Sequence, residues 1–117
     1  MKFYDDVYIG RDNYIARRVE TLLNNVTVDI SNLTRCTLEA VDTNPPYIID
    51  SDTEGYDDVF DWTTYGTQGL LGLRLGLVQD LPLGFITFKL VVYSDDFPSG
   101  LDDLRPVYFR VWNLSNG

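Results

Sequence analysis

The clearest alternation of apolar and polar residues lies between Leu83 and Ser94, in the stretch LGFITFKLVVYS. Every second residue from Ile86 to Val92 is apolar, whereas the residues between them mix aromatic, β-branched and charged side chains. Because successive side chains of a strand point to opposite faces, this pattern predicts a strand with one fully buried face and one partly covered face. Residues typical of turns lie on both sides of it, at 80–84 and 95–100. The stretch is therefore expected to be the central strand of a sheet.

Shorter stretches with similar alternation run along the rest of the chain. We expect strands at 3–9, 14–21, 26–30, 36–41, 47–49, 59–64, 70–75 and 106–114. Two prolines at 45–46 interrupt the pattern, since proline removes a backbone donor and fixes φ, and residues 50–58 form an acidic loop. Roughly seven to nine short strands at spacings of about 8–12 residues, with no convincing helix, predict an all-β fold, an antiparallel β-sandwich.

The composition fits one packed domain. The chain has 117 residues, enough for a single core, and its hydrophobic content is 44%. We therefore expect one domain over residues 1–117. The longest apolar runs are too short to cross a bilayer, and the first ten residues lack the features of a secretory signal, so neither a membrane partner nor export is expected. Cys36 is the single cysteine, so the fold must be stable without an internal disulfide.

The charged residues argue against nucleic acid as a partner and against most enzyme classes. The chain has 18 Asp and Glu residues against 9 Lys and Arg, a net charge of −9, whereas phosphate backbones are bound by clustered cations. The absence of histidine excludes a Ser-His-Asp triad, a Cys-His pair and the usual catalytic zinc sites. A glycosidase that pairs two of the carboxylates Asp57, Asp58 and Asp61 is the one enzyme chemistry left, and we expect no enzyme activity.

The acidic loop matches the spacing of a calcium-binding loop. Asp50, Asp52 and Glu54 occupy the first, third and fifth positions, a glycine occupies the sixth, and Asp61 the twelfth. Against such a site, the aspartate at the last position is shorter than the usual bidentate glutamate. The alternative is a solvated acidic loop between strands, and no cofactor is predicted.

Aromatic residues in and after this loop suggest a platform for a sugar. The rings of Tyr56, Trp62 and Tyr65 can cover the flat face of a ligand of that kind. Such residues more often belong to the core, which is the alternative prediction.

The order of segments resembles a known family. YIGRDNYI near the N-terminus is followed by DISNLTRCTLEA, YIIDSD, FDW, LRLG, LPLGFITFKLVVYS and YFRVW. The most specific parts are Gly10-Arg11-Asp12-Asn13, Asp50-Ser51-Asp52, Phe60-Asp61-Trp62 and Leu81-Pro82-Leu83-Gly84. This series resembles the immunoglobulin-like β-sandwich domain of tailed-phage virion proteins, as in the N-terminal domain of baseplate upper proteins.

The resemblance implies a non-enzymatic structural protein of a bacteriophage virion. Such a module docks to other virion proteins through protein-protein contacts, in multiple copies of a symmetric assembly. The sequence differs from the baseplate form in ending at Gly117 without a helical stalk or a receptor-binding domain, so a receptor-binding role is not carried over. The expected role is a tail or neck adaptor or a capsid decoration protein, located in the virion.

Aromatic side chains are the expected anchors of these contacts. The candidates are Tyr4, Tyr8, Tyr14, Tyr108 and Trp112. Each of them is equally explicable as a core residue. The alternative function is a carbohydrate-binding or adhesin module, assisted by calcium if the acidic loop binds it.

Overall fold

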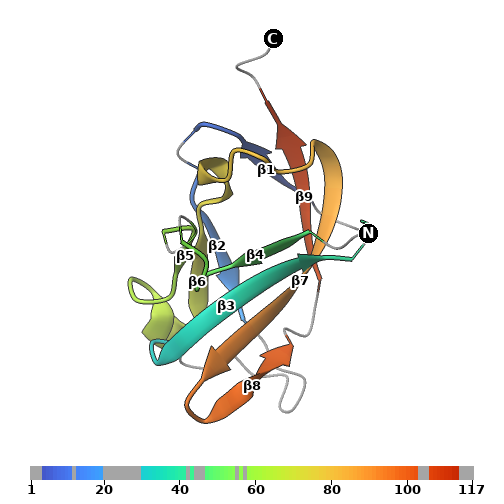
Figure 1. Ribbon diagram of the computed structural model, residues 1–117. Helices are drawn as coiled ribbons and strands as arrows, with labels where there is room; N and C mark the ends of the chain where they lie inside the picture. Colours follow the sequence, from blue (N-terminus) through green and yellow to red (C-terminus); the bar gives the residue numbers. More distant parts are fainter. Residues whose placement is uncertain are drawn as a thin grey trace.

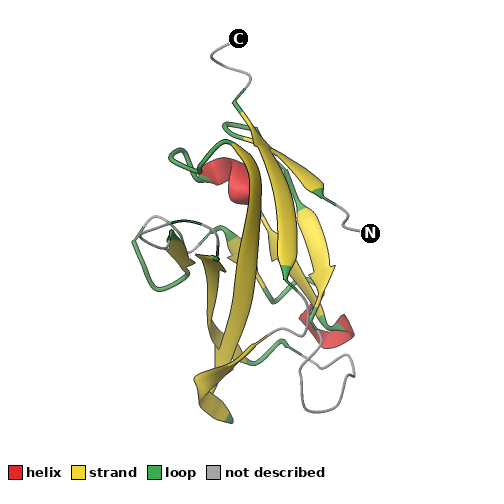
Figure 2. Cartoon of the chain, turned by 90° about the vertical axis from the view of Figure 1, so that its right-hand side faces the viewer, coloured by secondary structure: helices red, strands yellow, loops and turns green. Residues whose placement is uncertain are grey.

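The structure is a computed structural model that describes residues 4–11, 13–19, 30–41, 43, 47–54, 56, 58–102 and 106–113. These residues contain nine strands (Figure 1): β1 (Asp5–Tyr8), β2 (Ile15–Arg18), β3 (Leu33–Ala40), β4 (Ile48–Asp50), β5 (Phe60–Asp61), β6 (Leu70–Leu73), β7 (Gly84–Ser94), β8 (Phe97–Asp102) and β9 (Val107–Trp112). They also contain two 3-10 turns, η1 (Gly66–Gln68) and η2 (Leu75–Leu77). Strands dominate the described chain (Figure 2), which confirms the prediction of an all-β fold.

The strands form two sheets. The larger has the order β1-β9-β7-β3-β4, with β8 also paired to β7, and the smaller has the order β2-β6-β5. The pairs are antiparallel except for β1 and β9, which run parallel with Asp5 opposite Phe109. The prediction of a purely antiparallel arrangement is therefore wrong at this pair. A short turn forces the two strands it joins to run antiparallel. No hairpin joins the first and the last strand of the described chain, so these two strands can pair in the parallel direction.

Both sheets contribute to one hydrophobic core. Phe88 and Leu38 of the larger sheet and Leu71 and Leu73 of the smaller one are completely buried. Cys36 is a free cysteine in the same core, and burial raises the pKa of its thiol. It therefore acts as a small packing residue rather than a reactive nucleophile.

β7 is the central strand of the larger sheet. It pairs with β3 along one edge, and with β9 and then β8 along the other. Ile86, Phe88, Leu90 and Val92 face the core, each at most 2% exposed. The sequence prediction of a central strand with one fully buried face is confirmed.

β8 occupies most of the stretch for which the sequence predicts a turn. The turn itself is limited to residues 95–96, after which the chain returns along β7. Pro98 and Gly100 are typical of turns, which explains the wrong prediction. Among the described residues β8 pairs with β7 alone, and at such an edge a proline without an N–H is tolerated.

Other predicted strands are shorter than expected. Of the stretch 59–64 only the two residues of β5 are extended and paired, and the stretch 70–75 is divided between β6 and the start of η2. The predicted strand 26–30 lies outside the described residues except for Ile30, which is buried. The smaller sheet is therefore built from short strands, so turns and side-chain contacts contribute much of what holds these strands together.

Gly76 in η2 fixes how the turn after β1 packs. Its carbonyl accepts a 2.8 Å hydrogen bond from the N–H of Gly10, and a Cβ atom on Gly76 would lie 2.1 Å from the carbonyl oxygen of Arg11. We expect Gly76→Ala to lower the free energy of unfolding by roughly 3 kcal/mol, because the backbone must move to admit the methyl group. Urea denaturation measures the loss.

Gly10→Ala is the matched control. Gly10 has a φ of 82°, but no atom lies within 4 Å of a Cβ placed there. The expected cost is only the backbone strain of a left-handed alanine, about 1 kcal/mol. Equal losses in the two variants would contradict the role given to the close approach at Gly76.

Candidate functional site

Outward side chains of the neighbouring strands β1, β9 and β7 form the main candidate site. In the pairing register, Arg110 lies between Asp6 of β1 and Phe85 of β7. The residues that alternate with them in β9 and β7 are buried in the core, so the pleat of the strands directs these side chains outward. We define the Arg110 face as the set Tyr4, Asp6, Tyr8, Phe85, Tyr108, Arg110 and Trp112.

The guanidinium of Arg110 is stacked on rings of this face. Its central carbon lies 3.9 Å from the ring centroid of Trp112 and 5.2 Å from that of Phe85. The Nε1–H group of Trp112 donates a 3.0 Å hydrogen bond to Oδ1 of Asp6, and Tyr4 packs edge-on against Phe85 with centroids 4.7 Å apart. Cation-π and edge-to-face contacts of this kind hold the side chains in one arrangement.

Much of the face remains open to solvent. Phe85 is 61% exposed and Tyr4 is 37% exposed, although both are large apolar side chains. Arg110 is also exposed, and it forms no ion pair with any carboxylate of the described chain. Tryptophan, tyrosine and arginine are the residues that most often dominate the binding energy of protein interfaces.

The structure gathers four of the five aromatic anchors predicted from the sequence. Tyr4, Tyr8, Tyr108 and Trp112 belong to the Arg110 face. Tyr14 does not, because it precedes β2 and lies beside the smaller sheet. Contact of these residues with a partner stays a prediction.

Besides Asp6, two members of the face, Phe85 and Arg110, were not among the residues predicted for it. Both occupy outward positions of strands whose alternation is visible in the sequence. Their place in that alternation, rather than their residue type, is therefore the feature that could have identified them. The register between β7 and β9, which brings them together, is not visible in the sequence.

Asp50 and Asp52, two of the predicted calcium ligands, are bound by an arginine. Nε of Arg35 donates to Oδ1 of Asp50 at 2.9 Å, and Nη2 donates to Oδ2 at 2.5 Å. Asp52 has a carboxylate oxygen 3.6 Å from Nε of Arg35, and its backbone N–H donates to Oδ1 of Asp50 at 3.0 Å. The hydrogen bonds from Arg35 lower the pKa of Asp50 against the opposing effect of burial.

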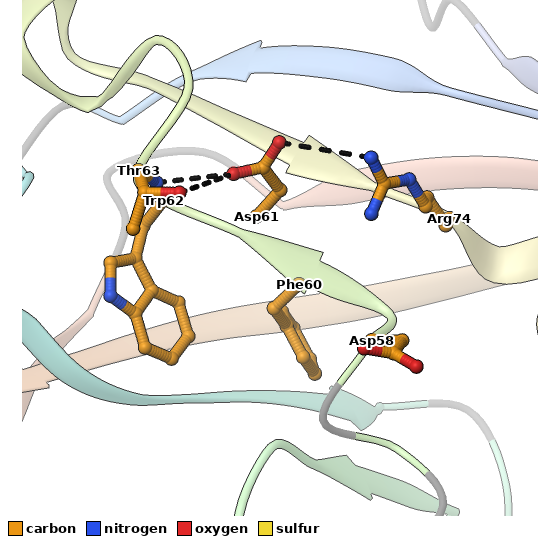
Figure 3. Close-up of a pocket in the computed structure, with 6 residues that line it drawn as sticks. All are labelled: Asp58, Phe60, Asp61, Trp62, Thr63 and Arg74. Atoms are coloured by element: carbon orange, nitrogen blue, oxygen red, sulfur yellow. Dashed lines mark hydrogen bonds and ion pairs between the residues drawn. The ribbon is translucent and has the colours of Figure 1, made fainter.

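Asp61, the predicted last calcium ligand, is held by hydrogen bonds in the smaller sheet (Figure 3). Oδ2 accepts a 3.0 Å hydrogen bond from the hydroxyl of Tyr14, and Oδ1 accepts 3.1 Å bonds from the N–H groups of Thr63 and Thr64. Nη2 of Arg74 lies 3.9 Å from Oδ2. Burial alone would raise the pKa of Asp61, but these bonds outweigh it and keep the pKa well below its usual range.

The structure does not bring the four predicted calcium ligands together. Asp50 and Asp61 end strands that belong to different sheets, and Glu54 is exposed. Within the described ranges, no group of three or more His, Cys, Asp or Glu side chains is placed to hold a metal ion. The carboxylates of Asp50 and Asp61 instead accept hydrogen bonds from neighbouring side chains and backbone.

A shallow pocket of about 280 Å³ lies beside Asp61, lined by Asp58, Phe60, Asp61, Trp62, Thr63 and Arg74 (Figure 3). A glycosidase needs one carboxyl group that stays protonated near neutral pH. The lowered pKa of Asp61 does not suit this acid, although it suits the ionised carboxylate that is the other member of such a pair. Asp57, the third candidate of the sequence analysis, lies outside the described residues.

The three rings predicted as a sugar platform have different surroundings. Tyr56 and Trp62 are partly buried and pack against the core, as the alternative prediction states. Tyr65 is exposed and packs edge-on against Tyr14, with ring centroids 6.5 Å apart. Trp62 is the one of the three that also lines the pocket.

Comparisons with known proteins do not place the chain in a family. No protein-family model matches it, and neither do any curated protein sequences or solved structures. In the part of the chain that the structure describes, no helix has the length and apolar character needed to cross a membrane.

We expect Asp61→Asn to lower the free energy of unfolding by about 2 kcal/mol at pH 7, because the variant loses a charge stabilised by several hydrogen bonds. The folded pKa of Asp61 lies below the unfolded value, so the contribution is present above about pH 4 and is lost as the pH falls toward the folded pKa. The difference between native protein and variant should shrink on acidification, which urea denaturation at about pH 7 and pH 3 measures.

Asp58→Asn is the control for this change. Asp58 lines the same pocket but is exposed, so its replacement should alter stability by less than about 0.5 kcal/mol at either pH. A loss in Asp61→Asn that stays constant with pH would contradict the proposed stabilisation of the charged form.

We also expect calcium at about 5 mM, above the range of weak protein sites, to leave the melting temperature unchanged. The reason is that the carboxylates of Asp50 and Asp61 already accept hydrogen bonds from other protein groups, and the two aspartates belong to different sheets. Differential scanning fluorimetry with calcium, magnesium and EDTA tests this. A rise that calcium causes and EDTA reverses would restore the calcium-loop hypothesis.

Proposed function

We propose that this protein is a non-enzymatic structural subunit of a tailed-phage virion, which docks to neighbouring subunits through the Arg110 face. The observation that carries the proposal is the exposed cluster of aromatic rings around Arg110. The phage assignment rests on the order of sequence segments that resembles the immunoglobulin-like domains of virion proteins. The contact chemistry rests on the geometry of the face.

The strand order supports an immunoglobulin-like sandwich. If β2, β5 and β6 are read as strands B, D and E, the smaller sheet has the order B-E-D. If β3, β4, β7 and β9 are read as C, C′, F and G, the larger sheet contains G-F-C-C′. β8 is an addition between F and G. The inter-sheet disulfide of antibody domains has no counterpart, since Cys36 is the single cysteine.

The properties of the face are those of an interface. Aromatic residues and arginine are enriched at the centres of protein interfaces, where a few well-packed side chains supply most of the binding energy. Phe85 leaves most of its ring in solvent, and covering it removes apolar area from water. The opposite face of the same strands packs into the protein core, so the rings lie on a rigid sheet.

A carbohydrate-binding module is the second candidate, favoured by the pocket beside Trp62. Trp62 lines this pocket together with the charged side chains of Asp58 and Arg74, and a ring with charged groups in one pocket suits a hydroxylated ligand. Binding on a glycan array that is lost in Trp62→Ala and kept in Phe85→Asp would favour this candidate over the first.

We expect the chain to be present at a fixed copy number in purified phage particles and Phe85→Asp to be absent from them. A charge at the centre of the contact should weaken docking by at least about 30-fold, as for a hot-spot residue. Quantitative mass spectrometry of particles from infected cells that express the variant measures incorporation. The melting temperature should change little, because Phe85 is largely exposed.

Leu77→Asp is the matched control, since Leu77 is a 48% exposed apolar residue in η2 and lies outside the Arg110 face. It should enter particles at the native copy number. Native incorporation of a folded Phe85→Asp protein, or particles without the native chain, would overturn the proposed function.

A further inference from the structure

Arg110 differs from two other arginines that stack on rings in the described chain. The guanidinium carbons of Arg35 and Arg74 lie 4.7 and 5.2 Å from the centroid of a tyrosine ring. Each of these arginines also has a carboxylate: Asp50 lies within hydrogen-bond distance of Arg35, and Asp61 lies 3.9 Å from Arg74. The outer surface of this protein thus twice combines a ring, a guanidinium and a carboxylate.

Arg110 has the rings, but no carboxylate of the residues that the structure describes forms an ion pair with it. It stacks on Trp112 and Phe85, yet none of the ion pairs of the described residues includes it. Asp6 lies directly opposite Arg110 in the register, but its Oδ1 accepts the indole N–H of Trp112. One oxygen of the carboxylate nearest in register is therefore engaged by Trp112.

Stacking leaves the most selective part of the guanidinium available. The guanidinium carbon lies over the rings of Trp112 and Phe85, and a ring stacked on a guanidinium contacts its face, whereas the N–H bonds lie in the plane and point away from its edge. This fork matches the two oxygens of a carboxylate, and a surrounding ring of apolar side chains excludes water and strengthens the pair. Tyr4, Tyr108 and Phe85 supply such surroundings on the Arg110 face.

We infer that Arg110 receives the side-chain carboxylate of an Asp or Glu on a different protein, presented between apolar residues that cover Phe85 and Trp112. The inference rests on the proposed docking function and adds the chemistry of the partner. A different protein fits better than a second copy, because two chains of net charge −9 repel each other. The local match of a cation with a carboxylate then gives the contact its specificity.

Phenylacetate is a suitable probe of this chemistry, with phenylacetamide as its uncharged analogue. We expect phenylacetate to shift the Nε–H signal of Arg110 and the indole N–H signal of Trp112 in proton–nitrogen NMR spectra, with a dissociation constant on the order of 10 mM for a ligand of about ten heavy atoms. Phenylacetamide should bind at least about fivefold more weakly, since an amide gains no charge-assisted bond. The indole signal of Trp62, beside the smaller sheet, should not move.

Two variants test the assignment to Arg110. Arg110→Gln should reduce the affinity for phenylacetate to that for phenylacetamide. Lys89→Gln removes a positive charge from the outward side of β7, where Lys89 already has a partner in Asp102, and should leave the affinity unchanged. Equal binding of the two probes, no shift at Trp112, or an equal loss in both variants would overturn the inference.

Particle incorporation tests whether the carboxylate comes from a protein. Arg110→Gln should reduce the copy number in particles, whereas Lys89→Gln should not. Binding of phenylacetate together with normal incorporation of Arg110→Gln would assign the site to a free ligand and overturn the inference. So would a dimer in sedimentation experiments that Arg110→Gln dissociates. If Phe85→Asp blocks incorporation but Arg110→Gln does not, the docking function stands and the carboxylate partner is rejected.

Discussion

The pairing of β7 along both of its edges is the constraint on which the rest of the structure depends. Its alternation buries Phe88 and three other apolar side chains, and the same alternation turns Phe85 outward. A shift of one residue in register would exchange the two sets, which the loss of core burial strongly disfavours. The core and the Arg110 face are thus two consequences of one register, since β9 and β1 take their positions from β7.

The smaller sheet depends on side chains more than on strand pairing. β5 has two residues, and Gly72 of β6 leaves room for the ring of Tyr14, whose hydroxyl oxygen would lie 2.1 Å from a Cβ at that position. Tyr14 crosses the sheet to reach Asp61, and Asp61 also accepts bonds from the turn that follows β5. A carboxylate therefore joins three segments that short strands alone would hold weakly.

The sequence predicted most of the strands because burial of one face leaves a period-two pattern in the chain. β7, β9 and the buried Cys36 were visible in this way. β8 was missed, since Pro98 and Gly100 are typical of turns, although a sheet edge tolerates them. The parallel pairing of β1 with β9 was also missed, because strands distant in the chain leave no local trace of their direction.

The candidate site shows the same limit. Four aromatic members were found by residue type, whereas Arg110 and Phe85 owe their place to register. The acidic loop shows the converse: the carboxylates have the spacing of a calcium loop, but Asp50 and Asp61 end strands of different sheets. Spacing along the chain describes a site only where the intervening residues form one loop around the ion.

The support of the Arg110 face bears on how the proposed docking can be specific in an acidic protein. Arginine side chains lose much conformational freedom when they bind, and a long-range negative field weakens the approach of any carboxylate. In the Arg110 face, Trp112 and Phe85 already restrict the movement of the guanidinium, and Asp6 holds the indole of Trp112 by accepting the indole N–H. Less entropy is then lost on contact, and the gain from pairing depends on short-range geometry rather than on net charge. A partner that places a carboxylate at Arg110 and apolar atoms on Phe85 satisfies both conditions, whereas an acidic surface without the apolar flanks meets only the repulsion.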